Sequence, residues 1–197
     1  MNILFLSRQL RVPASVSTKQ MATRNLIFLL DRSGSMESCW DDTIGGFNSF
    51  VTDQKALGGK LTLVQFDHEY YVAYENIDLK NVSPLTRETF KPRGSTALLD
   101  AIGKAIKSTS EVSTLIILTD GHENASREYT KAHVKDLIEQ KTNEAWTVMY
   151  LGANQDAFAE AGSMGIHAGN TVSYDTARTP DMFARLSQTI SSQASNI

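Results

Sequence analysis

The chain has 197 residues, of which 41% are hydrophobic, 21% charged and 8% aromatic. Its 19 basic and 22 acidic side chains leave a formal charge of −3, without the clustered excess of Lys and Arg that nucleic-acid binding requires. This composition indicates a globular domain with one sizeable core and argues against a nucleic-acid partner.

A single cysteine, Cys39, excludes a disulfide within this chain, a CxxC redox centre and a thiolate zinc cage. A reducing compartment fits this cysteine usage best, so we expect a cytoplasmic protein. The longest unbroken apolar stretches, 26–30 and 115–118, are far shorter than the roughly 20 residues that a membrane-spanning helix needs. We therefore expect no membrane partner.

The N-terminal segment differs in composition from the rest of the chain. Its basic residues are scattered among Ser and Thr, and the apolar stretch Ile3 to Leu6 is too short for a secretory signal peptide. An organelle transit peptide remains an alternative. We expect residues 1–21 to form a disordered extension, because they hold too few apolar side chains to offset the entropy of ordering, and Met21 is a second candidate start. The folded domain is expected over 22–197.

From there, apolar patterns predict strands and helices in alternation. A continuous apolar run predicts a buried strand over 25–30, which ends at the polar sequence Asp31-Arg32-Ser33-Gly34-Ser35. Trp40, Ile44, Phe47 and Val51 share one helical face, although Gly45 and Gly46 each cost about 1 kcal/mol relative to Ala. Aromatic and β-branched residues over 60–66 and 70–77, joined by Asp67-His68-Glu69, predict a hairpin and hence one antiparallel strand.

The second half of the chain continues the alternation. A helix is predicted over 96–107, and a second buried strand over 113–118 stops at Thr119-Asp120-Gly121. A helix around Val134, a strand over 146–151, a short helix over 155–161 and a short strand over 171–174 follow. Thr179 as N-cap and Pro180 at the first helical position then open a last helix, whose Phe183, Leu186 and Ile190 share one face.

This alternation predicts right-handed crossovers and parallel strand pairing. We expect an α/β fold: a doubly wound, mostly parallel six-stranded sheet with one antiparallel edge strand and helices on both faces. In the strand order 3-2-1-4-5-6, the first and fourth strands are neighbours, and ligands bind at their carboxyl ends, where the chain order reverses. Asp31 and Asp120 end these two strands.

Hard oxygen donors gather at this position. The loop after the first strand offers Asp31, Ser33 and Ser35, the segment before the second core helix adds Thr96, and Asp120 supplies a second carboxylate. Mg²⁺ prefers six oxygens, often keeps waters and takes one or two protein carboxylates. The pattern therefore predicts a Mg²⁺ site, with Mn²⁺ and Ca²⁺ as alternatives. Two carboxylates only neutralise the ion, so we expect it to remain electrophilic towards an outside oxygen at an open coordination position.

The segments Asp31-x-Ser33-x-Ser35, Thr96 after Gly-Ser, and Thr119-Asp120-Gly121, in this order, resemble the metal-ion-dependent adhesion site (MIDAS) of a von Willebrand factor type A (vWA) domain. The resemblance covers about 25–190 and all five motif positions. It implies that the two serines and Thr96 ligate the ion directly and that both aspartates hold it partly through water. It also implies that a carboxylate of a partner protein completes the shell, and that the loops and last helix move between states of different affinity.

Each part of the motif also has a structural explanation, because Asp, Ser and Thr are common in turns and at helix N-caps. Their joint occurrence in three segments favours the metal site. His122, Glu123 and Asn124 come next in the chain, and form either a rim that selects partners or an ordinary solvated loop. Trp40 is expected to pack in the core, and Cys39 to be an inert, partly buried thiol.

The sequence carries no dinucleotide fingerprint, P-loop or GxSxG elbow. The strongest enzymatic alternative is a Mg²⁺-dependent phosphoryl hydrolase with Asp31 as nucleophile. Such enzymes usually carry a second Asp two residues further on as general acid, and Ser33 at that position cannot donate a proton near neutral pH. We therefore expect a metal-dependent protein-binding module rather than an enzyme, and an adaptor subunit of a cytosolic ATPase or chelatase complex is an alternative setting.

Overall fold

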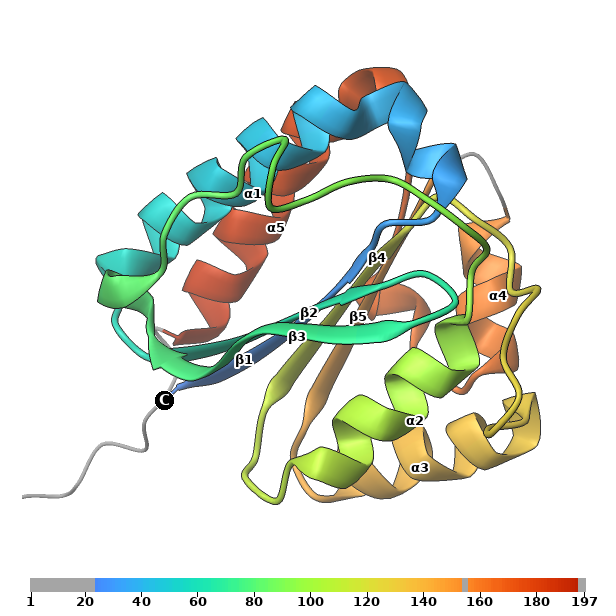
Figure 1. Ribbon diagram of the computed structural model, residues 1–197. Helices are drawn as coiled ribbons and strands as arrows, with labels where there is room; N and C mark the ends of the chain where they lie inside the picture. The colour runs from blue at the N-terminus through green and yellow to red at the C-terminus, as the bar shows by residue number, and fades with distance from the viewer. Residues whose placement is uncertain (1–23, 154–155, 195–197) are drawn as a thin grey trace, which may run out of the picture.

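The computed structural model describes residues 24–153 and 156–194, so the expected extension over 1–21 lies outside the described residues. Six strands form one sheet in the order β3-β2-β1-β4-β5-β6 (Figure 1). They are β1 (Asn25–Asp31), β2 (Lys60–Phe66), β3 (Tyr70–Asp78), β4 (Thr114–Thr119), β5 (Thr147–Ala153) and β6 (Thr171–Tyr174). All neighbouring pairs are parallel except β2 with β3. The predicted sheet and strand order are confirmed.

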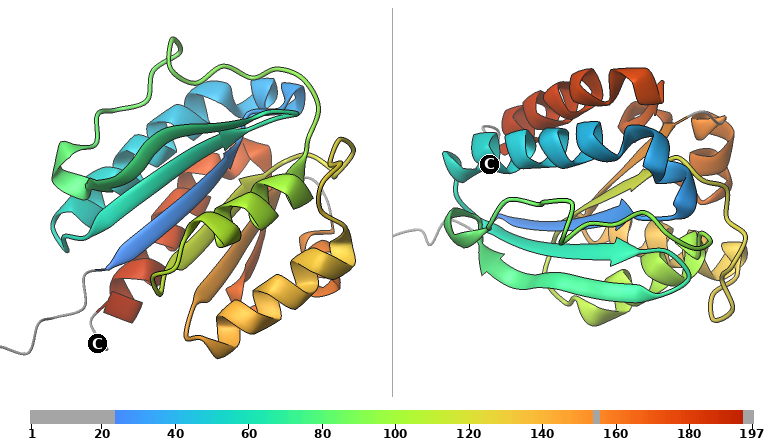
Figure 2. Two further views of the ribbon diagram at one scale, coloured as in Figure 1. Left: turned by 60° about the horizontal axis from the view of Figure 1, so that its bottom comes forward. Right: turned by 45° about the horizontal axis from the view of Figure 1, so that its top comes forward.

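Helices cover both faces of the sheet (Figure 2). They are α1 (Trp40–Lys55), α2 (Leu98–Ser108), α3 (Lys131–Asn143), α4 (Ala157–Ser163) and α5 (Thr179–Ala194). The pair α1 and α5 packs on one face, whereas α2, α3 and α4 pack on the other. None of these helices, within the described ranges, is long and apolar enough to cross a bilayer.

The position of β1 inside the sheet, between β2 and β4, explains the continuous apolar run over 26–30. Leu26, Phe28 and Leu30 point into the core under α1 and α5, whereas Ile27 and Leu29 point into the core under α2 and α3. Successive side chains of a strand face opposite sides, so the interior positions of a strand covered on both faces are apolar, and in β1 only the end residues Asn25 and Asp31 are polar. All seven residues of β1 are buried.

The two glycines of α1 have different surroundings. Gly45 is exposed, and a Cβ there would meet no atom within 4 Å. A Cβ at Gly46 would overlap the ring of Phe183, so this glycine permits α5 to approach α1 closely. The expectation of a simple helix-propensity cost therefore describes Gly45 only. Trp40 packs at the edge of the same core and donates from Nε1 to the carbonyl oxygen of Phe90 at 2.7 Å, as a core-packing role predicts.

The start of α5 differs from the prediction. Thr179 has helical dihedral angles, φ −51° and ψ −42°, and its hydroxyl donates to the carbonyl oxygen of Thr176 at 2.8 Å. A residue that caps a helix N-terminus has extended dihedral angles and accepts from the helix instead. Thr179 is therefore the first helical residue and not the N-cap, because the 3-10 turn Thr176–Arg178 already leads the chain into the helix.

Candidate metal site

The five predicted site residues all lie at the carboxyl edge of the sheet, where the loops gather on the right of Figure 1. Asp31 ends β1 and Asp120 follows β4, and these two strands are paired neighbours. Ser33 and Ser35 lie in the loop and 3-10 turn that follow β1. Thr96 lies two residues before α2, which begins at Leu98 and not at 96 as predicted. Its hydroxyl therefore belongs to the loop edge of the sheet.

The three hydroxyl groups converge over the backbone of Gly121. From the position that a Cβ on Gly121 would take, Thr96 Oγ1 lies 2.7 Å away, and Ser33 Oγ and Ser35 Oγ each lie 3.4 Å away. The two serine oxygens are 3.1 Å apart, and Ser35 Oγ donates to Asp120 Oδ1 at 2.5 Å. Oxygens from three separate segments thus meet beside one small residue.

Asp31, the last residue of β1, is fully buried. Its Oδ1 accepts from the backbone N–H of Ser33 and its Oδ2 accepts from the hydroxyl of Thr119, both at 2.6 Å. Burial raises the pKa of Asp31 from 3.8 to about 6, even though both hydrogen bonds favour the charged form and oppose this rise. Burial also raises the pKa of Asp120.

Thr119 is a contributor that sequence reasoning missed. Its hydroxyl orients Asp31 from the neighbouring strand and lies 3.1 Å from the backbone N–H of Gly121, which donates to it. The signal was present in the sequence, because a threonine that ends a strand beside a strand ending in aspartate is in reach of that carboxylate.

The donor set fits a hard divalent cation. Among the described residues, neither Asp31 nor Asp120 forms an ion pair, and a buried carboxylate without a compensating charge is unfavourable. The same part of the chain contains no group of three or more His, Cys, Asp or Glu side chains arranged to hold a metal. Two carboxylates with three hydroxyls are the oxygen donors that Mg²⁺ accepts, and one divalent charge would neutralise both acids.

Basic side chains beside the site are held by other partners. Arg32 Nε and Arg93 Nε lie 3.0 Å and 2.8 Å from Oδ2 of the fully buried Asp67. The backbone N–H of Arg93 donates to the carbonyl oxygen of Arg32 at 2.7 Å, and that of Ala97 donates to the carbonyl oxygen of Asp67 at 2.8 Å. These contacts join the loops after β1 and β2 to the segment before α2. They therefore fix the backbone segments that carry the three converging hydroxyls.

The segment after Asp120, for which the sequence left a partner-selecting rim and a solvated loop as alternatives, is attached to the start of α2. His122 and Asn124 are exposed and Glu123 is half-buried, but the side chains of Glu123 and Asn124 accept hydrogen bonds from backbone groups at the start of α2. Asn124 Oδ1 accepts from the backbone N–H of Thr96, and Glu123 Oε2 accepts from the backbone N–H of Leu99, both at 2.9 Å. Sequence reasoning missed these roles because they depend on the position of α2, which is distant in sequence.

Cys39 has no part in this chemistry. Its side chain is 2% exposed, and burial raises the pKa of its thiol. A protonated, inaccessible thiol is a poor nucleophile and a poor metal ligand. The expectation of an inert cysteine agrees with this environment.

No protein-family model matches the chain. A curated relative, the uncharacterized protein sll0103 of Synechocystis sp., is 27% identical over 124 residues, which cover 58% of this chain and 30% of that protein. The chain therefore spans less than a third of the length of this relative.

Solved structures resemble the chain more extensively. The vWF domain of the type V pili tip protein Mfa5 from Porphyromonas gingivalis has a TM-score of 0.67 at 12% identity, covering 87% of this chain and 96% of that one. The pilus adhesin SpaC from Lactobacillus rhamnosus GG has a TM-score of 0.68 at 12% identity, over 87% and 30%. A von Willebrand factor type A structure from Catenulispora acidiphila has a TM-score of 0.56 at 16% identity, over 84% and 42%. Together with the strand order, these similarities show that the chain has the fold of a von Willebrand factor type A domain.

Proposed function

We propose that this chain is a protein-binding module that holds Mg²⁺ and through it engages a carboxylate of a partner protein. The ligand set consists of Asp31, Ser33, Ser35, Thr96 and Asp120, and Mn²⁺ or Ca²⁺ are alternative ions. The observation that carries the proposal is the convergence of three hydroxyls from separate segments beside two carboxylates without an ion pair among the described residues.

Two kinds of side chain in the candidate site would hold such an ion. The two aspartates supply charge neutralisation, and Ser33, Ser35 and Thr96 supply neutral oxygens that add no further negative charge. When bound, the ion offers an electrophilic position to an oxygen from outside the chain. Thr119 and the backbone N–H of Ser33 orient Asp31 for this task.

The similar structures include those of a pili tip protein and a pilus adhesin, which favours a binding role over catalysis. The geometry of Asp31 also disfavours phosphoryl transfer. Its carboxylate is fully buried and both of its oxygens accept hydrogen bonds at 2.6 Å, whereas a nucleophile must approach the phosphorus atom directly. We therefore propose a non-enzymatic module. A cytoplasmic setting and an adaptor role in an ATPase or chelatase complex remain predictions from the sequence.

Calorimetric titration of the metal-stripped protein with Mg²⁺ and Mn²⁺ tests the metal site. The comparison is between the wild type, the double variant Ser33→Ala/Ser35→Ala and the control Ser49→Ala, which changes an exposed serine of α1. We expect saturable binding in the wild type and in the control, and none in the double variant, with circular dichroism confirming that all three are folded. Absence of binding in the wild type would refute the metal site.

Retention on an immobilised polyglutamate resin tests the carboxylate partner. The formal charge of −3 opposes non-specific attraction to this resin. Retention of the wild type in Mg²⁺, release by EDTA and no retention of the double variant are expected. A wild type that binds Mg²⁺ but is not retained would refute the carboxylate-binding role while leaving the metal site intact.

A further inference from the structure

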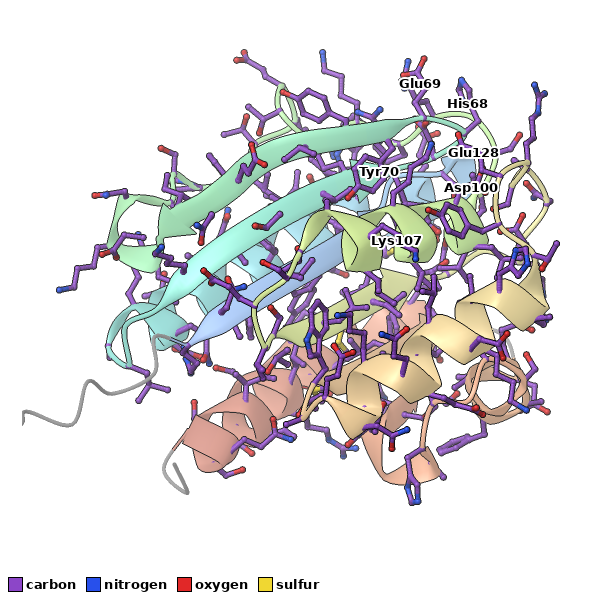
Figure 3. The ribbon with its side chains drawn as sticks, turned by 90° about the horizontal axis from the view of Figure 1, so that it is seen from below. His68, Glu69, Tyr70, Asp100, Lys107 and Glu128 are labelled. Atoms are coloured by element: carbon purple, nitrogen blue, oxygen red, sulfur yellow. The ribbon has the colours of Figure 1, made fainter. Side chains whose placement is uncertain are left out.

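The loop over 121–129 is attached to the first turn of α2 by side chains that the proposed metal site does not use. The carboxylate of Asp100, on α2, accepts from the backbone N–H groups of Arg127, Glu128 and Tyr129 at 2.9, 2.9 and 2.8 Å. Figure 3 shows Asp100 on α2 close to Glu128 of this loop. Three hydrogen bonds to one carboxylate fix the far end of the loop on the helix.

Glu123 fixes the near end of the same loop. Its Oε1 accepts from the backbone N–H groups of Ala125 and Ser126 at 3.0 and 2.8 Å, which closes a turn within the loop. Its Oε2 accepts from the backbone N–H of Leu99 at 2.9 Å and from the hydroxyl of Ser126 at 2.7 Å. An N–H in the first turn of a helix has no partner within the helix, so Glu123 satisfies one such group and places a negative charge at the favourable end of α2.

Asn124 completes the attachment at Thr96 itself. Asn124 Oδ1 accepts from the backbone N–H of Thr96 at 2.9 Å. The carbonyl oxygen of Thr96 accepts from the backbone N–H groups of Asn124 and Ala125 at 3.0 and 3.1 Å. Both backbone polar groups of Thr96 are therefore held by residues that follow Asp120 in the chain.

We propose that Asn124 and Glu123 are positioning residues that couple Thr96 to Asp120, so that these two ligands move as one unit. The inference rests on the proposed metal site, and it assigns to Asn124 and Glu123 a role in metal affinity without contact to the ion. Residues that orient metal ligands typically change affinity by about 10- to 100-fold when they are replaced.

Titration of the metal-stripped protein with Mg²⁺ tests this coupling. In Asn124→Ala the backbone N–H of Thr96 loses its acceptor, whereas the backbone hydrogen bonds of the loop remain available. The matched control is Asn143→Ala, which changes an exposed asparagine at the far end of α3. We expect Mg²⁺ affinity at least about tenfold weaker in Asn124→Ala and unchanged in the control.

Hydrogen exchange provides a readout that a merely structural role would not change. In the wild type, Mg²⁺ is expected to slow exchange in 96–101 and in 121–129 together. In Asn124→Ala at saturating Mg²⁺, protection is expected in 121–129 but not in 96–101. Protection of both segments in this variant would contradict coupling through Asn124.

The outcomes separate this inference from the proposed function. A wild type without Mg²⁺ binding refutes the metal site, and the positioning role with it. A wild type that binds Mg²⁺, with an Asn124→Ala variant whose Mg²⁺ affinity is within twofold of the wild type, refutes the positioning role alone.

If Asn124→Ala does not fold, Glu123→Gln serves instead, because its amide keeps one acceptor for the turn within the loop and loses the acceptor for the backbone N–H of Leu99. A tenfold loss of affinity in that variant supports the inference, and an unchanged affinity overturns it.

Discussion

Replacement of Asp31 by Asn removes a charge from a buried position with almost no change in shape. The amide oxygen still accepts from the backbone N–H of Ser33. The hydroxyl of Thr119 lies 3.2 Å from the carbonyl oxygen of Gly121, so it can donate there and accept from the new amide nitrogen. The variant Asp31→Asn therefore keeps both hydrogen bonds and isolates the effect of the charge.

The pKa of Asp31 determines the size and the sign of this effect. Because the fold raises this pKa from 3.8 to about 6, the metal-free folded state binds a proton more tightly than the unfolded chain does. At 1.36 kcal/mol per pH unit, the stability linked to Asp31 is about 3 kcal/mol. It is fully present below about pH 4 and is lost as the pH rises to about 6. Asparagine does not ionise, so the variant keeps this stability of about 3 kcal/mol at high pH as well.

Urea unfolding with EDTA, from pH 4 to pH 8, measures the difference. We expect Asp31→Asn to exceed the wild type by about 3 kcal/mol at pH 8, or roughly 6–12 °C in Tm, and the two stabilities to converge near pH 4. Added Mg²⁺ should stabilise only the wild type, by about 2.7 kcal/mol at 100 times Kd. A variant that is no more stable than the wild type at pH 8 without metal, or a difference independent of pH, would refute this reasoning.

Three further predictions concern single residues. Gly46→Ala should destabilise the fold by about 1–3 kcal/mol, because its Cβ would overlap the ring of Phe183 on α5. Gly45→Ala should instead stabilise the fold by about 0.5–1 kcal/mol, because no atom lies within 4 Å of the new Cβ. Urea unfolding midpoints compare the two variants, and equal effects would contradict the packing argument. Cys39 should react with a thiol reagent only after denaturation, and rapid labelling of the native protein would contradict its burial. Gly121→Ala should fold but lose Mg²⁺ binding in calorimetry, since a Cβ 2.7 Å from Thr96 Oγ1 displaces that hydroxyl; retained affinity would show that the hydroxyl is dispensable.

Much of the fold is determined by local patterns in the sequence. The run of apolar residues over 26–30 and the alternation of strands with helices predicted a doubly wound sheet, and its common strand order 3-2-1-4-5-6 is the order observed. That order placed Asp31 and Asp120 at adjacent strand ends, because the carboxyl ends of parallel strands lie at one edge. The positions of the candidate ligands could therefore be predicted without knowledge of any tertiary contact.

Other features depend on contacts between segments that are distant in sequence. Periodicity shows which face of α1 is buried, but it does not show that the ring of Phe183 lies against Gly46. Likewise, Glu123 and Asn124 are polar residues of a loop, which the sequence alone cannot distinguish from a solvated rim.

Only the packed structure shows that Glu123 and Asn124 hold the start of α2 and the backbone of Thr96. The physical reason is that burial patterns record whether a side chain leaves water, whereas a hydrogen bond also requires a particular partner at a particular distance and angle. For this chain, the sequence determined the fold and the candidate ligands, and the tertiary structure decided which residues hold those ligands in place.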